Sequence, residues 1–166
     1  MKRITLFAVV ALALLAPAHA QEVPPSAAKL AATASIDRHR AELVTLSDQI
    51  WEFAETALKE YRSAALLADF AEAQGFRVER GVAEMPTAFV ASYGSGRPII
   101  GVLGEYDALP GISQKVQTAK EAFEEGAAGH GCGHNLFGTA SLGAALAVKE
   151  LIAAGELDGT AVSYTH

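Results

Sequence analysis

A seven-residue segment, Gly129 to Asn135, brings together the residue types that bind transition metals. It reads Gly-His-Gly-Cys-Gly-His-Asn and holds the single cysteine of the chain. Thiolate and imidazole groups suit zinc and similar ions, so Cys132 and His134 are candidate metal ligands. Asn135 predicts the N-cap of a helix that runs to about Ala154, which places both groups at the positive end of a helix dipole. By spacing alone, the segment also fits an inert turn with a small buried cysteine.

A second polar segment, Glu105 to Gly111, follows an apolar run at residues 99–104. Glu105 and Asp107 are two positions apart, and carboxylates with this spacing can bind a cation or orient a ligating histidine. The same residues also fit a strand end that leads into a Pro-Gly turn. The polar stretch from Ile112 to Gly129 is either a cover over a site or a surface connection.

The N-terminal residues have the organisation of a secretion signal. Two basic residues precede an apolar run that ends at Ala16, and residues 18–20 read Ala-His-Ala, the small-x-small form of a signal peptidase site. The apolar run is shorter than the roughly twenty residues that span a bilayer. We therefore predict a signal peptide over residues 1–20 and a periplasmic or secreted protein without a membrane anchor. Since the lone cysteine has no internal disulfide partner there, a bound metal would protect it.

The charge of the mature chain indicates which partners to expect. Removal of the signal leaves eleven Lys and Arg residues against nineteen Asp and Glu residues, a net charge of −8. This acidity disfavours nucleic acid and anionic membrane surfaces as partners. The remaining length is enough for one domain with a hydrophobic core.

Two helices are predicted before the first strand. Residues 21–35, with two adjacent prolines and several alanines, read as a flexible leader. From Ser35 to about Ala57, apolar residues recur at steps of three and four, which predicts an amphipathic helix. A second helix is predicted from Ser63, with Gly75 as its stop signal.

Short apolar runs predict strands at residues 76–80, 88–93, 98–105 and 160–164. The run at 99–104 is apolar without alternation, which predicts a strand buried on both faces. Together with the helices, these strands indicate an α/β fold in which helices pack on a mixed, largely parallel sheet. Binding sites in such folds lie beyond the carboxyl ends of the central strands, where both polar segments fall.

The two polar segments also resemble known motifs. Gly104–Gly111 and Gly129–Leu136 resemble the two N-terminal motifs of the metal-dependent amidohydrolases of metallopeptidase family M20, and Glu55–Ser63 resembles the first-helix region of that family. Asn135 and the Glu-Tyr-Asp form of the earlier motif are most similar to the aminobenzoyl-glutamate utilisation branch. The resemblance extends over about residues 36–164. It implies that residues 36–166 form the N-terminal part of an incomplete zinc-peptidase-like catalytic domain.

The resemblance implies roles for several side chains. Cys132 and His134 match ligands of a centre that holds two divalent ions, zinc or manganese, and Asp107 matches an aspartate that supports the ligands. Glu105 occupies a position where other branches carry a metal-binding histidine, and His130 matches a histidine close to the centre. Neither these two residues nor the terminal His166 receives an assigned role.

The family pattern continues beyond Tyr164 through a turn whose two acids supply the general base and a further ligand, whereas this sequence ends in Thr165-His166. We therefore expect the 166 residues to be an inactive part of a longer enzyme. The resemblance implies a homodimeric amidohydrolase that acts on a small N-acyl or N-aroyl amino acid such as aminobenzoyl-glutamate, and the signal over residues 1–20 implies that this enzyme is exported. The alternatives are a metal-binding or thiol redox module, for which no Cys-x-x-Cys pair is present, and a non-catalytic interaction domain.

Overall fold

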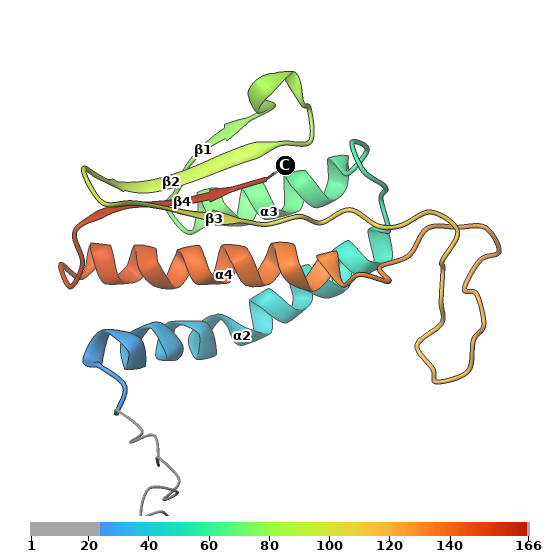
Figure 1. The fold of residues 1–166 in the computed structure, drawn as a ribbon, viewed down its shortest axis with the longest axis horizontal. Helices are drawn as coiled ribbons and strands as arrows, with labels where there is room; N and C mark the ends of the chain where they lie inside the picture. Colours follow the sequence, from blue (N-terminus) through green and yellow to red (C-terminus); the bar gives the residue numbers. More distant parts are fainter. Residues whose placement is uncertain (1–23, 166) are drawn as a thin grey trace, which may run out of the picture.

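A computed structural model describes residues 24–165 of the chain (Figure 1). The predicted signal peptide, residues 1–20, and His166 lie outside the described residues. In chain order the elements are α2 (Ala27–Phe53), α3 (Tyr61–Ala73), β1 (Arg77–Arg80), the short 3-10 helix η1 (Val82–Glu84), β2 (Phe89–Ser95), β3 (Ile99–Leu103), α4 (His134–Ala153) and β4 (Gly159–Tyr164). The helices and strands that the sequence predicts in this region are all present, with shifted ends.

Helix α2 begins earlier than its apolar spacing predicts. The Ser26 side chain accepts a hydrogen bond from the backbone N–H of Lys29 and caps the helix, so residues 27–35 of the predicted flexible leader are helical. Ser35, the predicted cap, is a buried residue inside the helix. The helix ends at Phe53 because Ala54 adopts a left-handed conformation with φ 44°.

The start of α3 is held by a side chain from outside the helix. The Glu55 carboxylate accepts hydrogen bonds from the backbone N–H groups of Arg62 and Ser63 and from the Ser63 hydroxyl, at 2.8–3.0 Å. These N–H groups have no partner within the helix, and a carboxylate at this end is also favoured by the helix dipole. The helix stops just before Gly75, where φ is 86°, as the sequence predicts.

The four strands form one mixed sheet in the order β1-β2-β4-β3. The pair β3–β4 is parallel, whereas β1–β2 and β2–β4 are antiparallel. The α/β class and the mixed sheet are as predicted, but antiparallel pairings outnumber parallel ones among the described residues. The parallel pair is joined through α4, which forms the crossover that such a pair requires.

Strand β3 differs from its prediction. It lies at an edge of the described sheet, and its side chains Ile99, Ile100 and Leu103 are 61%, 50% and 37% exposed. An unbroken apolar run shows that both faces of a strand could be buried. It does not show whether another part of the protein covers each face. The prediction of a strand buried on both faces is therefore not met within residues 24–165.

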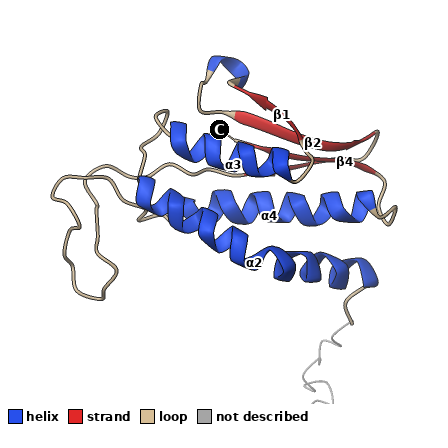
Figure 2. Ribbon diagram, turned by 180° about the vertical axis from the view of Figure 1, so that it is seen from behind, coloured by secondary structure: helices blue, strands red, loops and turns tan. Residues whose placement is uncertain are grey.

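The core lies between the helices and one face of the sheet (Figures 1 and 2). Buried Phe89 and Ala91 of β2 pack in one cluster with Leu67 of α3 and with Leu142 and Leu146 of α4. Helix α2 packs on the far side of α4 and contributes Leu46 and Ile50. Among the described helices, α4 alone is long and apolar enough to cross a membrane, but half of its residues are buried inside this fold, as in a core helix.

Candidate metal centre

The end of β3 and the start of α4 meet at one place, although a long loop separates them in the sequence. Among the described residues, Glu105, Asp107 and His134 form a group whose ligand atoms all lie within 4.8 Å of one another. His134 Nδ1 lies 2.6 Å from Asp107 Oδ1, and His134 Nε2 lies 3.5 Å from Glu105 Oε2. All three side chains are partly exposed, so an ion from solvent can reach them.

Alternation along the strand end places the two acids on one side. Tyr106, between them, is fully buried, and its hydroxyl donates a hydrogen bond to the backbone carbonyl of Thr87. Burial raises the Tyr106 pKa, so the hydroxyl stays protonated and remains a donor. The backbone N–H of Ala108 donates to the Glu55 carbonyl at 2.7 Å. The segment that carries Glu105 and Asp107 is therefore fixed on its buried side.

His134 is positioned by the beginning of α4. Gly133 is the N-cap, with φ 78°, and His134 is the first helical residue. The predicted cap, Asn135, instead lies in the first turn, where it is buried and its side-chain amide donates to Ser47 Oγ of α2 at 3.0 Å. The prediction of an Asn135 cap is wrong because the glycine before His134 adopts the left-handed turn and the asparagine joins the two helices.

The hydrogen bond to Asp107 defines the chemistry that His134 can perform. A carboxylate accepts a hydrogen bond from Nδ1–H, so the proton stays on Nδ1 and the lone pair of Nε2 is free for a metal ion. Nε2 faces the Glu105 carboxylate. Imidazole nitrogen with carboxylate oxygen is a donor set that suits zinc or manganese, so the residues present fit a divalent ion.

Cys132, the other predicted ligand, is exposed and is not a member of this group. It lies in the loop that leads into α4, two residues before His134. The structure thus brings together His134 and Asp107, two of the residues singled out in the sequence, and adds Glu105, whose role the sequence leaves open. The sequence feature that indicates Glu105 as a site residue is its spacing from Asp107, since residues i and i+2 of an extended segment point to the same side.

His130, four residues before His134, contacts the end of α2. Its Nε2 is 3.0 Å from the Ile50 carbonyl oxygen, and because a carbonyl only accepts, Nε2 carries the proton. Its Nδ1 is buried and has no hydrogen-bond partner among residues 24–165. Burial lowers the His130 pKa, so the neutral ring is favoured.

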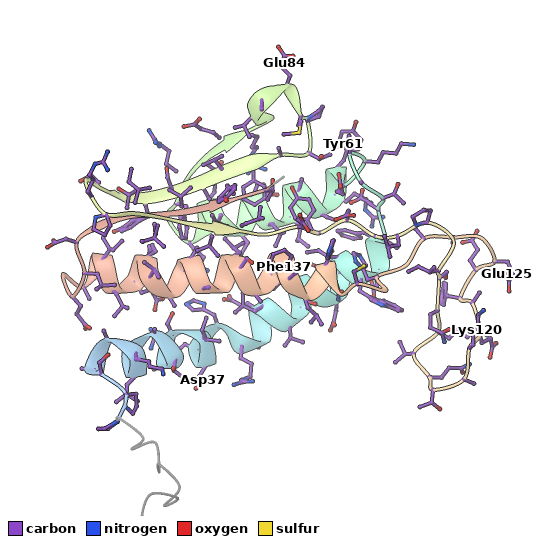
Figure 3. The ribbon with its side chains drawn as sticks, in the orientation of Figure 1. Asp37, Tyr61, Glu84, Lys120, Glu125 and Phe137 are labelled. Carbon is purple, nitrogen blue, oxygen red and sulfur yellow. The ribbon has the colours of Figure 1, made fainter. Side chains whose placement is uncertain are left out.

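The long loop before α4 projects from the body of the fold, and Lys120 and Glu125 lie on its outer part (Figure 3). A cavity of about 830 Å³ separates this loop from the end of α2, and its wall includes Trp51, Phe123 and His130. At the start of α4, Phe137 lies beside His134, with ring centroids 6.1 Å apart. The loop therefore joins the site through its base, whereas its tip extends into solvent.

Comparison with known proteins agrees with the sequence motifs. The chain is 48% identical over 117 residues to a subunit of the p-aminobenzoyl-glutamate hydrolase of Escherichia coli, an alignment that covers 70% of this chain and 24% of that protein. It is 33% identical over 144 residues to human Xaa-Arg dipeptidase, covering 79% of this chain and 28% of that protein. The chain thus spans about a quarter of the length of the curated relatives it matches.

The fold is also found among solved structures. A dinuclear metal binding peptidase of the M20 family from Bacillus subtilis superposes with a TM-score of 0.64 at 19% identity, covering 78% of this chain and 35% of that one. No protein-family model matches the sequence. At this identity the superposition shows that the described residues have the fold of part of such a peptidase.

Proposed function

Because this chain belongs to metallopeptidase family M20, in its aminobenzoyl-glutamate hydrolase branch, we propose that it is part of a metal-dependent amidohydrolase. The substrate class is an N-aroyl or N-acyl amino acid, of which aminobenzoyl-glutamate is the first to test. The observation that carries the proposal is the His134–Asp107 hydrogen bond beside Glu105, at the end of a strand. It provides an oriented imidazole and a carboxylate in a chain that is similar to a p-aminobenzoyl-glutamate hydrolase subunit and to a Xaa-Arg dipeptidase.

Two groups of this chain would hold a divalent ion directly. His134 presents Nε2, because its Nδ1–H donates a hydrogen bond to Asp107. Cys132 presents an exposed thiol on a loop with glycine on each side. When bound, the ion would polarise the amide carbonyl and lower the pKa of water. Glu105, 3.5 Å from His134 Nε2, would contribute negative charge beside the ion or bind it through an oxygen.

We propose zinc or manganese as the metal, with two ions in the full-length enzyme.

We also propose that the protein is exported and cleaved after Ala20. This proposal is supported by the basic start, the apolar run and the Ala-His-Ala site. A homodimer is proposed for the full-length enzyme. No feature of the described residues favours the alternative of a thiol redox module, since Cys132 is the single cysteine of the chain.

The direct test uses the full-length protein, stripped of metal with a chelator and then given zinc or manganese. We expect release of glutamate from aminobenzoyl-glutamate only after metal is restored, with N-acetylated amino acids compared as substrates. Full activity in the stripped protein would contradict the metal requirement. Metal-restored protein that releases no amino acid from any of these amides would contradict the proposed reaction.

A further inference from the structure

Helix α4 and the segment that carries the two acids touch through their backbones. A Cβ atom added at Gly138 would lie 2.8 Å from the Glu105 carbonyl oxygen and 3.2 Å from Tyr106 Cβ. A Cβ atom at Gly104, on the opposite side of the contact, would lie 3.0 Å from Ser141 Cβ and 3.3 Å from Gly138 Cα. Because two glycines face each other, the helix approaches the strand end more closely than any side chain at position 138 would permit.

This contact lies directly beside the candidate metal centre. Gly138 is four residues after His134, so the two lie on the same face of α4, one turn apart. On the other side, the contact is made by Glu105 itself and by its neighbour Tyr106. The separation of the two backbones at Gly138 therefore determines how far the His134 ring lies from the carboxylates of Glu105 and Asp107.

The surroundings leave little room for adjustment. Tyr106 is fully buried, stacks on Phe89 with ring centroids 6.3 Å apart, and is hydrogen-bonded to the Thr87 carbonyl. The atom that a new methyl group would meet first belongs to the backbone, which cannot rotate away as a side-chain end can. A substitution at 138 must therefore move Glu105 or the start of α4, and either movement alters the distances at the centre.

We propose that Gly138 is a positioning residue for the metal centre. This inference rests on the proposed function. It sets the approach of His134 to the two carboxylates, including the 2.6 Å contact with Asp107. A larger residue at 138 is expected to weaken metal binding without removing any ligand. The effect differs from a loss of stability because it is confined to the spacing of donor atoms.

The same helix offers a matched control. A Cβ atom at Gly143 would meet Leu43 Cδ1 of α2 at 3.0 Å, which is the end of a flexible side chain rather than backbone. Both Gly138→Ala and Gly143→Ala add one methyl group inside α4 and raise its helix propensity equally. Only the first methyl group would meet the backbone of Glu105, which carries a carboxylate of the metal centre.

The experiment measures binding of Zn²⁺ and Mn²⁺ to the full-length wild type, Gly138→Ala and Gly143→Ala by competition with a chromophoric chelator. We expect metal binding about 10- to 100-fold weaker in Gly138→Ala, the range known for changes in groups that support metal ligands, and wild-type binding in Gly143→Ala. The absorption spectrum of bound Co²⁺ should also change in Gly138→Ala alone. Wild-type affinity and spectrum in Gly138→Ala would overturn the inference.

Two further outcomes remain decisive. If Gly138→Ala does not fold, Gly104→Ala tests the same contact from the strand, and unchanged metal affinity in that variant would overturn the inference. If the wild type binds metal but hydrolyses none of the amides, the proposed reaction fails while the comparison of affinities still decides the role of Gly138. If the wild type binds neither ion, Gly138 has no metal centre to position.

Discussion

At the scale of single residues, the hydrogen bond between His134 and Asp107 is the most informative contact in the molecule. It fixes the tautomer of the imidazole and ties the first residue of α4 to the end of the β3 segment. The histidine and the aspartate were both predicted from the sequence, because their residue types and local spacing indicate metal chemistry. The position of Glu105 beside the histidine needed the structure, since only the fold brings its carboxylate to 3.5 Å from His134 Nε2.

Replacing Asp107 with asparagine tests this contact. The amide is isosteric but carries no charge, so it holds the Nδ1 proton less strongly and permits the wrong tautomer. We expect about 10- to 100-fold weaker metal binding in the full-length protein, measured by chelator competition. Asp69→Asn is the control, because Asp69 is an exposed partner of Arg80 in a surface ion pair. Unchanged metal affinity in Asp107→Asn would remove the orienting role.

Replacing Cys132 with alanine tests whether the thiol is a ligand. The side chain is exposed, so its loss should leave the melting temperature of the metal-free protein unchanged. We expect the full-length variant to lose bound metal, measured by elemental analysis, and to lose amide hydrolysis. Full metal occupancy with wild-type turnover would show that Cys132 is not a ligand.

At the scale of elements, the helices and strands were predictable because apolar spacing and glycine stops are local signals. Their ends were less predictable, because caps depend on single side chains such as Ser26 and on backbone turns such as that at Gly133. The exposure of β3 and the antiparallel pairings depend on which strands become neighbours. That information is long-range, and no local pattern contains it.

The contact between α2 and α4 provides a pH-dependent prediction. His39 of α2 lies 3.0 Å from Glu42 and 3.0 Å from Glu150 of α4, and Arg38 also pairs with Glu150. Hydrogen bonds to Glu42 and then to Glu150 raise the His39 pKa above 6.5. The folded state therefore binds the proton more tightly than the unfolded state. This stabilisation is fully present below pH 6.5 and is lost as the pH rises through the folded-state pKa.

The measurement compares wild type and His39→Gln by urea unfolding on both sides of that pKa. We expect the free energy of unfolding of the wild type to exceed that of the variant at the acidic pH, with the difference shrinking at the alkaline pH. A difference that stays constant with pH would show that protonated His39 does not stabilise the helix pair.

At the scale of the whole molecule, the described residues form one core beneath one sheet, with apolar side chains exposed along β3. The family and fold class could be predicted from two motifs and the order of elements. The compartment in which the protein works is a separate question that the fold does not address, because the predicted signal lies outside residues 24–165.

Export is tested by N-terminal sequencing of protein recovered from the periplasm or medium of an expressing bacterium. We expect the mature chain to begin at Gln21, because the Ala-His-Ala site ends at Ala20. Replacing Ala18 and Ala20 with larger residues should block processing. Recovery of unprocessed protein that begins at Met1 from the exported fraction would contradict cleavage.

The loop before α4 is closed at its base by two backbone hydrogen bonds, in which Leu109 and Gly129 each donate to the carbonyl of the other at 3.0 and 2.9 Å. Residues between them can therefore change in number without altering the path of the chain at Asp107 or His134. Lengthening a closed loop costs little, about 0.6 kcal/mol for each doubling. Evolution, or an engineer inserting a label or binding peptide, can thus vary this loop while the chemistry beneath it stays in place.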